Sequence, residues 1–309
     1  MTDRRGTAPL TRRHCLAGLG LTGLGLAGMR LAGLAASGLV LSGGVARAAT
    51  PARVVCLEWT SAEMVVSLGA APIAVGDTRG YGDWVQGPAL PQATIDLGSR
   101  SEPNLELLRE LRPDLIVGAY GYGLDESSFT RLAPTFNVPF YSGKAAPYAQ
   151  AQEVTLQLGE LLGRKAEAQV LVERIEASIA QARAALAQKP QKPLCVVSLF
   201  DDRHVRIYGT GSLLQDVLDR LGLVNAWAGT TNEWGFSTVG IEELVAVGDA
   251  RLISLDPIPP HIKIRIARSS LWANLPCVRN GQVRTIPPVW PFGGLAAAGR
   301  FARFVAATS

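Results

Sequence analysis

Three of the six tryptophans lie in short segments dense in glycine and proline, where tryptophans of a hydrophobic core are uncommon. They are Trp84, Trp234 and Trp290, and Phe292 follows the last of them by two positions. Such segments are typical of loops, and rigid rings on loops offer a large apolar area at a low entropic cost. We therefore expect these loops to meet around a bulky, partly apolar ligand.

Two polar residues are suited to hold oxygen atoms of such a ligand. Arg100 is predicted in the loop before a helix, where its forked guanidinium group could reach carbonyl or anionic oxygens. Tyr122 follows a predicted strand that ends at Val117, and open α/β sheets bind their ligands at the carboxyl ends of strands. The alternative is that Arg100 forms a surface salt bridge and that Tyr122 packs within a turn.

The sequence offers little support for catalysis. Gly209-Thr-Gly-Ser212 precedes a predicted helix, but it lacks the third glycine of a dinucleotide-binding motif and the lysine of a phosphate-binding loop, so we predict a strand-to-helix turn. No nucleophile elbow of the form G-x-S-x-G occurs in the sequence. The competing interpretation is an exported hydrolase that uses Ser212 or Ser237 with His204 or His261.

These two histidines are the only ones that follow residue 48. A histidine-rich metal site is therefore not expected, and we predict neither a metal site nor a cofactor.

The first 48 residues have the features of an export signal. Arg12 and Arg13 precede a long stretch rich in glycine, alanine and leucine, and Ala46-Arg-Ala48 is a small-x-small cleavage motif. We predict a twin-arginine signal peptide over residues 1–48 and a mature protein in the periplasm. The alternative is a membrane anchor that is never cleaved and that carries a scaffold.

Removal of this segment changes the charge of the chain. Residues 1–48 hold six arginines and one aspartate, so the formal net charge of the remainder is −1 in place of +4. Nucleic acid is therefore not an expected partner.

Beyond the signal, short apolar runs alternate with helical patterns, which predicts an α/β fold with largely parallel sheets. The predicted strands cover residues 53–57, 73–75, 114–117, 194–199 and 252–255, and the predicted helices cover 61–68, 105–111, 213–221 and 241–247. Residues 164–189 contain no glycine or proline and repeat apolar residues at helical spacing, so we predict one rigid helix. We expect this helix to join an N-terminal lobe over residues 49–163 to a C-terminal lobe over residues 190–309.

A weak internal repeat relates the two predicted lobes. Glu106 and Glu242 each lie at the start of a predicted helix that leads into a predicted strand. One interpretation is purely local, because the helix dipole favours a carboxylate in the first turn.

Longer blocks of the sequence resemble the family of periplasmic ferric-hydroxamate, or ferrichrome-type, siderophore-binding proteins. These blocks include Leu57-Glu-Trp59, Ile95-Asp-Leu-Gly-x-Arg100-x-Glu-Pro-Asn-Leu-Glu-Leu-Leu108, Gly121-Tyr-Gly123, Asn225-Ala-Trp227 and Pro288-Val-Trp290. The resemblance implies a class III binding protein, with two α/β lobes joined by one helix. Such a protein is expected to be a monomer that delivers its cargo to an ABC permease with its ATPase.

The resemblance also implies roles for individual residues. Arg100 and Tyr122 would bind hydroxamate oxygens, and Glu106 and Glu242 would dock against arginines of the permease. The remaining ligand contacts would be aromatic: Trp84, Trp234, Phe236, Trp290 and Phe292.

The sequence departs from the family pattern beside these aromatic residues. Phe236 stands where the family can offer a small hydroxyl residue, Glu233 replaces an aromatic residue, and Pro291 interrupts an aromatic run. A ferric trihydroxamate is nearly neutral and already holds its iron six-coordinate, so aromatic walls and one arginine suit it. The preferred siderophore stays open, and haem and cobalamin are the competing bulky chelates.

Overall fold

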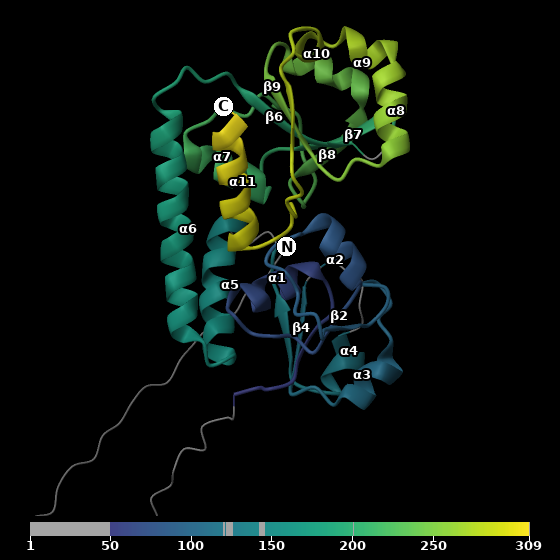
Figure 1. The fold of residues 1–309 in the computed structure, drawn as a ribbon, viewed down its shortest axis with the longest axis vertical. Coiled ribbons are helices and arrows are strands. Elements are labelled where there is room, and N and C mark those ends of the chain that lie inside the picture. Colours follow the sequence, from purple (N-terminus) through teal and green to yellow (C-terminus); the bar gives the residue numbers. More distant parts are fainter. Residues whose placement is uncertain (1–49, 120, 122–125, 142–145, 200, 309) are drawn as a thin grey trace, which may run out of the picture. The chain divides into compact units, whose positions relative to one another are not determined.

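The computed structural model describes residues 50–119, 121, 126–141, 146–199 and 201–308, and the chain from Ala48 onward forms one compact unit (Figure 1). The predicted signal peptide and Tyr122 lie outside the described residues, so both stay predictions. None of the described helices is long and apolar enough to cross a membrane.

The first lobe is built on a five-stranded sheet in which every strand pair is parallel. From edge to edge the strands are β3 (Ile95–Asp96), β2 (Ala74–Val75), β1 (Val54–Cys56), β4 (Leu115–Ala119) and β5 (Thr135–Val138). The helices α1 (Trp59–Ser67), α2 (Thr78–Trp84), α3 (Leu105–Leu111) and α4 (Glu126–Thr130) follow β1, β2, β3 and β4 in turn. The strand order changes direction at β1, and α/β sheets bind ligands beside such a point, at the carboxyl ends of the strands.

The second lobe has a mixed sheet with the strand order β10 (Val283–Ile286), β9 (Arg251–Leu255), β6 (Leu194–Leu199), β7 (His204–Tyr208) and β8 (Phe236–Gly240). The first three strands are parallel, and β7 is antiparallel to both of its neighbours. The helices of this lobe are α7 (Leu213–Leu221), η1 (Ile241–Val247), α8 (Pro260–Arg268), α9 (Ser270–Asn274) and α10 (Pro276–Arg279). The helix predicted over residues 241–247 is present as the 3₁₀ helix η1.

Three helices pack together beside the two sheets (Figure 1): α5 (Pro147–Leu161) and α6 (Lys165–Leu186), which connect the sheets in the chain, and α11 (Leu295–Thr308), which follows the second sheet. Helix α6 is the predicted connecting helix, and its 22 residues span about 33 Å at 1.5 Å per residue. The side chains of α6 that are buried, at helical spacing along one face, pack against α5 and α11. The predicted two-lobe α/β fold is confirmed, but α6 packs against three further helices, α5, α7 and α11, and does not join the lobes alone.

The segment around Trp84 differs from its prediction. It is not a loop, because Trp84 is the last residue of helix α2. The side chain of Asp77 accepts a hydrogen bond from the backbone N–H of Gly80 at 2.9 Å and so caps the helix. Tyr81 is buried and donates its hydroxyl to the carbonyl of Pro88 at 2.6 Å. The cap and the buried ring offset the low helix propensity of the glycines in this segment.

The sheets are apolar on both faces because both faces are covered. In β1, Val55 points into an outer core under α3, whereas Val54 and Cys56 point into an inner core. That inner core also holds Val196 of β6 and Phe301 of α11. One continuous apolar cluster therefore extends through both lobes.

A buried carboxyl group joins α1 of the first lobe to the start of α11. Glu63 accepts hydrogen bonds from the backbone N–H of Ala297 at 2.7 Å and of Gly294 at 3.4 Å. The first N–H groups of a helix have no acceptor within the helix, so this carboxyl group supplies one. Burial raises the pKa of Glu63 to about 8, although the two N–H groups and Arg300 act in the opposite direction.

We predict that Glu63 gives the protein a stability that decreases as the pH rises. Because its pKa is higher in the folded state than in the unfolded chain, the folded state holds the proton more tightly. This contribution is complete below the unfolded value of 4.5 and is lost as the pH rises through about 8. Urea unfolding at several pH values between about 4 and 9 should therefore show a steeper decline for the wild type than for Glu63→Gln. The exposed control Glu173→Gln should follow the wild type, and identical profiles for Glu63→Gln and the wild type would contradict the prediction.

Candidate ligand-binding site

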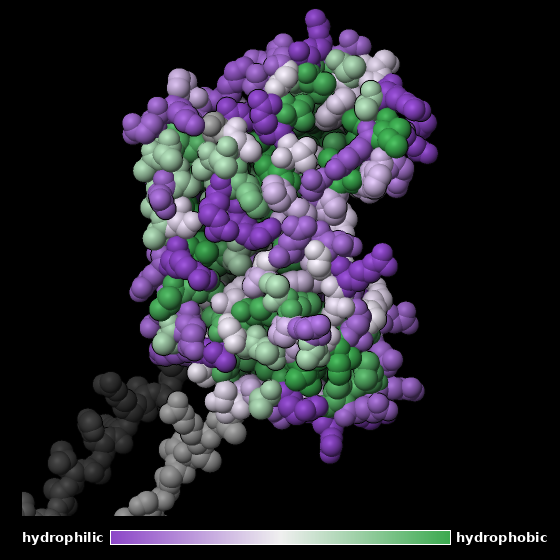
Figure 2. Space-filling view, in the orientation of Figure 1, coloured by the Kyte–Doolittle hydropathy of each residue, from purple (hydrophilic) through white to green (hydrophobic). Residues whose placement is uncertain are grey.

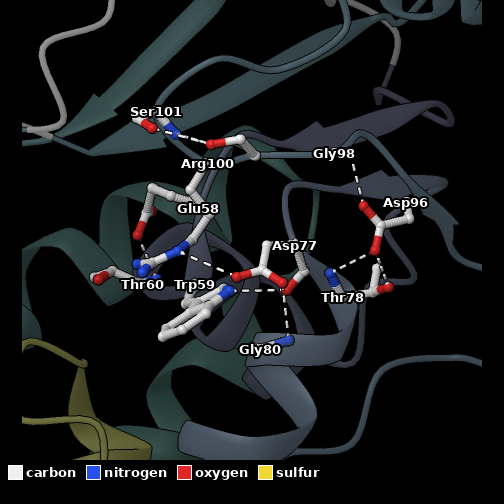
Figure 3. A network of polar contacts seen from close by, with 11 residues as sticks. Glu58, Trp59, Thr60, Asp77, Thr78, Gly80, Asp96, Gly98, Arg100 and Ser101 are labelled. Carbon is white, nitrogen blue, oxygen red and sulfur yellow. Dashed lines mark hydrogen bonds and ion pairs between the residues drawn. The ribbon is translucent and has the colours of Figure 1, made fainter.

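Residues that follow the strands of the first sheet form a polar and aromatic cluster (Figure 3). Trp59 and Thr60 follow β1, Asp77 follows β2, and Arg100 follows β3. These strands are parallel, so their carboxyl ends bring the four residues to one edge of the sheet.

Arg100 is held against tryptophan rings. Its Cζ lies 3.3 Å from the ring centroid of Trp59 and 5.5 Å from that of Trp290, which belongs to the second lobe. Its Nε lies 3.8 Å from Oδ2 of Asp77, and the indole N–H of Trp59 donates to the carbonyl of Asp77 at 2.9 Å. A guanidinium group stacked in this way is fixed in position while 23% of its side chain stays exposed. Arg100 does form a salt bridge, as its alternative interpretation proposed, but the partner is Asp77, which belongs to this cluster.

Asp96 stabilises the loop that leads to Arg100. Its carboxylate accepts hydrogen bonds from the backbone N–H of Gly98 at 2.7 Å and of Thr78 at 2.9 Å, and also from the Thr78 hydroxyl (Figure 3). These bonds join the loops that follow β2 and β3. The ion pair of Asp77 with Arg100 is therefore set by bonds within the first lobe.

The aromatic segment of the second lobe is held by side chains of the first. The indole N–H of Trp290 donates to Oγ1 of Thr60 at 3.0 Å, and the same hydroxyl donates to the carbonyl of Phe292 at 3.1 Å. The hydroxyl of Tyr141 donates to the carbonyl of Pro291 at 3.1 Å. The position of this segment thus depends on both lobes.

Phe292 is the centre of an aromatic cluster. Its ring centroid lies 5.2 Å from that of Trp290, 5.7 Å from those of Trp234 and Tyr141, and 6.0 Å from that of Phe236. All four pairs are edge-to-face, the geometry that aromatic quadrupoles favour.

Trp234 reaches from a turn of the second lobe to Gly121 of the first. A Cβ atom at Gly121 would lie 2.1 Å from the indole, so only glycine allows this approach. Gly235, at φ +74°, passes so close to the backbone of Ser212 that a Cβ atom there would lie 2.1 Å from its nitrogen. The two glycines place the Trp234 ring between the lobes.

A cavity of about 210 Å³ lies beside this cluster. It is lined by Trp84, Ser198, Leu199, Arg206, Tyr208, Leu255, Asp256, Pro257, Val289, Trp290, Pro291 and Phe292. A more open cleft of about 480 Å³ shares Trp84, Asp256 and Pro257 with it, and Figure 2 shows this hollow between α2 and α8 at the right-hand edge. Cavity and cleft therefore form one recess between the lobes.

The structure places the predicted ligand residues around this recess in different ways. Trp84, Trp290 and Phe292 line the cavity itself. Trp234 and Phe236 contact Phe292 without lining the cavity. Arg100 lines neither the cavity nor the cleft, and its Cζ lies 5.5 Å from the ring centroid of Trp290.

Sequence reasoning missed four residues of this region: Trp59, Thr60, Tyr141 and Arg206. Arg206 could have been predicted, because it lies between Val205 and Ile207 in a strand and so points to the opposite face of the sheet from them. The contact of Thr60 with Trp290 joins residues 230 positions apart, and no local pattern indicates it.

The hydroxyl groups named for a hydrolase have structural partners. Ser212 caps α7 by accepting from the N–H of Gln215 at 3.0 Å, and Ser237 donates to the carbonyl of Thr230. His204 lies 3.0 Å from Asp201. Within the described residues, no three His, Cys, Asp or Glu side chains gather as a metal site would require.

The fold and the aromatic recess between the lobes define a two-lobed α/β binding protein. The chain belongs to the periplasmic binding protein family, whose model matches residues 54–289. This family consists of binding proteins, so the chain is a binding protein of a transport system and not an enzyme.

Comparison with individual proteins shows how similar the chain is to members with a stated ligand. The chain is 36% identical over 258 residues to the iron(3+)-hydroxamate-binding protein FhuD of Escherichia coli (strain K12), which covers 84% of this chain and 87% of that protein. It is 26% identical over 252 residues to the Fe(3+) dicitrate-binding periplasmic protein FecB of the same organism, which covers 77% of each. The crystal structure of the siderophore-binding protein FhuD from Vibrio cholerae with Fe³⁺-Desferal has a TM-score of 0.78 and 30% identity, covering 83% of this chain and 97% of that one.

We predict that Thr60 is required to hold the aromatic segment. Thr60→Val keeps the shape of the side chain but leaves the indole N–H of Trp290 and the carbonyl of Phe292 without this partner. Each lost partner of a buried polar group costs about 1–3 kcal/mol, so urea unfolding should show a loss of about 2–6 kcal/mol. The control Thr155→Val removes a buried hydroxyl that bonds only within its own helix, to the carbonyl of Ala151, and should cost less than about 1 kcal/mol. Equal losses in the two variants would contradict a special role for Thr60.

Proposed function

We propose that the protein, exported through the signal predicted over residues 1–48, captures iron(III)-hydroxamate siderophores in this recess and delivers them to an ABC permease. The observation that carries the proposal is the position of Arg100, stacked on Trp59 and Trp290 beside the aromatic cluster. Arg100 would donate to hydroxamate oxygens around the iron, and Tyr122 would join it. Trp84, Trp234, Phe236, Trp290 and Phe292 would contact the apolar frame of the siderophore.

The chemistry of the cargo fits these groups. In a ferric hydroxamate the siderophore supplies the iron ligands, and the coordinated oxygens still accept hydrogen bonds. A guanidinium fork presents several N–H groups in one plane, which suits neighbouring oxygens on one face of such a complex. Aromatic rings bury the hydrocarbon frame without a loss of polar contacts.

The position of Arg100 implies a rearrangement. The cavity of about 210 Å³ and the cleft of about 480 Å³ together reach the size typical of ligand pockets, but Arg100 lines neither of them. A chelate in contact with both Trp84 and Arg100 would extend from the cleft toward Trp290. We therefore expect rings of the aromatic cluster to rotate when the ligand enters.

We predict that Arg100→Gln weakens binding of a ferric hydroxamate by about tenfold to a hundredfold, because a charge-assisted hydrogen bond contributes about 1.5–3 kcal/mol. Tryptophan fluorescence of the mature protein would be titrated with ferrichrome, a ferric catecholate, haem and cobalamin. Arg109→Gln, which removes an exposed arginine of α3, is the control and should bind as the wild type does. Unchanged affinity in Arg100→Gln would remove Arg100 from the site, and tighter binding of haem or cobalamin would replace the proposed ligand.

We also propose that Glu106 and Glu242, exposed in the first turns of α3 and η1, contact the permease. Charged groups at a transient interface chiefly set orientation and association rate. Replacement of both glutamates by lysine, which reverses their charge, should leave ligand affinity unchanged and lower uptake into cells at least severalfold. The same reversal at Glu110 and Glu173, which are also exposed, is the control. Normal uptake by the Glu106/Glu242 variant would reject the proposal.

A further inference from the structure

A further pocket lies outside the aromatic recess, where helices α1, α6 and α11 come together. It has a volume of about 450 Å³, and the described residues that line it line neither the cavity nor the cleft of the recess. Helices α6 and α11 lie side by side at this place (Figure 1). Three arginines line the pocket, Arg174 of α6 with Arg300 and Arg303 of α11, and none of its described lining residues is acidic. We call it the basic pocket.

Two of these arginines have no partner for their charge. The side chains of Arg174 and Arg303 are exposed, and within the described residues neither side chain forms an ion pair or a hydrogen bond. No acidic residue lies three or four positions from either one in its helix, which is the spacing at which helical side chains pair. Glu173 and Glu176 lie one and two positions from Arg174, so they point to other sides of α6. Both positive charges can therefore act on a ligand in the pocket.

Arg300 has partners, but they do not neutralise its charge. Its Nη2 donates to the carbonyl of Pro288 at 2.9 Å, and its Cζ lies 5.3 Å from the ring centroid of Phe304. Its Nε is buried, and no described atom accepts a hydrogen bond from it. Glu63 is the acidic group that acts on Arg300, but burial raises the pKa of Glu63 to about 8, so its carboxyl group is mostly protonated at neutral pH. Arg300 thus adds to the positive charge of the basic pocket.

This grouping of like charges is unfavourable for the protein alone. Arg300 and Arg303 are three positions apart in α11, where like charges repel, and the helix contains no acidic residue to offset them. Burial lowers the pKa of Arg300, and the charge of Arg303 acts in the same direction. The chain after residue 48 has a formal net charge of −1, so the cluster does not follow from a generally basic surface. An anion bound between the arginines would remove the repulsion.

The number of arginines favours a phosphate group over a single carboxylate. A guanidinium fork donates two parallel N–H bonds to neighbouring oxygens of an anion. A carboxylate offers two oxygens in one plane, whereas a phosphate offers three or four oxygens in a tetrahedron, so it can accept from forks that approach from different helices. The volume of about 450 Å³ lies within the 300–1,000 Å³ typical of ligand pockets, and it leaves room for the group to which the phosphate is attached.

We propose that the basic pocket is a second binding site of this protein and that it takes a phosphate group with at least two negative charges. Arg174 and Arg303 would bind the phosphate oxygens, and Arg300 would add its charge from the wall. The site is separate from the recess, so it does not depend on which ligand the recess binds. A soluble phosphate ester and the headgroup of a phosphate monoester lipid share this chemistry.

Calorimetric titration of the mature protein in phosphate-free buffer tests the site. The probes are inorganic pyrophosphate, glycerol 3-phosphate and, as a dianion without phosphorus, succinate. We expect both phosphates to bind and succinate to bind about tenfold or more weakly, because each of its carboxylates offers only two oxygens. Higher salt concentration should weaken the binding of both phosphates.

Variants assign the binding to the basic pocket. Arg174→Gln and Arg303→Gln should each weaken pyrophosphate about tenfold or more, because each removes charge-assisted hydrogen bonds. Arg183→Gln, which removes an exposed arginine of α6 outside the pocket, should bind as the wild type does.

Urea unfolding shows whether the variants stay folded. Without phosphate, Arg303→Gln should be at least as stable as the wild type, because the repulsion with Arg300 is gone. Pyrophosphate should raise the unfolding midpoint of the wild type and leave that of Arg303→Gln unchanged.

Vesicles distinguish the two sources of the phosphate group. The wild type and Arg303→Gln would be sedimented with vesicles of phosphatidylcholine, with and without phosphatidic acid. Binding that needs both phosphatidic acid and Arg303 identifies a lipid headgroup, whereas binding of the soluble phosphates alone identifies a soluble ester. The proposal is wrong if the wild type binds neither the soluble phosphates nor the vesicles, if Arg174→Gln and Arg303→Gln bind pyrophosphate as tightly as the wild type, or if succinate binds as tightly as glycerol 3-phosphate.

Discussion

The arrangement of the recess depends on bonds between helix α1 and the chain segment that follows β10. Two buried side chains one helical turn apart make these bonds: Thr60 holds Trp290 and Phe292, and Glu63 caps α11. Buried polar groups of this kind are costly to leave without a partner, so they specify one relative position of the two lobes. Trp290 can stack beside Arg100 only because this position is fixed. The aromatic wall is thus a product of the contact between the lobes and not of either lobe alone.

The inner core adds a second constraint. Residues of β1, β6 and α11 belong to one apolar cluster, with the buried row of α6 running through it. A wide opening of the lobes would expose part of this cluster to water at about 25 cal/mol per Å² of apolar area. Small side-chain rotations around Phe292 expose far less, which makes them the cheaper way to admit a ligand. The motion expected on binding is therefore mainly one of rings.

Local patterns in the sequence were sufficient for much of the fold. The strand Leu194–Leu199 and the helices Leu105–Leu111 and Leu213–Leu221 have the predicted bounds, because apolar periodicity and caps determine them. Trp84 was misassigned because a side-chain cap and a buried tyrosine outweigh two glycines. Helix α5 was overlooked, and the 3₁₀ form of η1 has no clear sequence signal. Within the site, the aromatic residues could be predicted from their unusual segments, whereas the partners of Thr60 and Arg206 depend on contacts between distant parts of the chain.

The inner core also has a consequence for the order of folding. Val54 of the first strand and Val305 of the last helix are fully or almost fully buried in the same cluster. Contacts between residues this far apart form late, since the loop that they close is long. The first lobe therefore cannot bury its inner face while α11 is still within the ribosome. The native core can form only after α11 has left the ribosome, and the apolar inner face of the sheet stays exposed and needs protection until α11 docks.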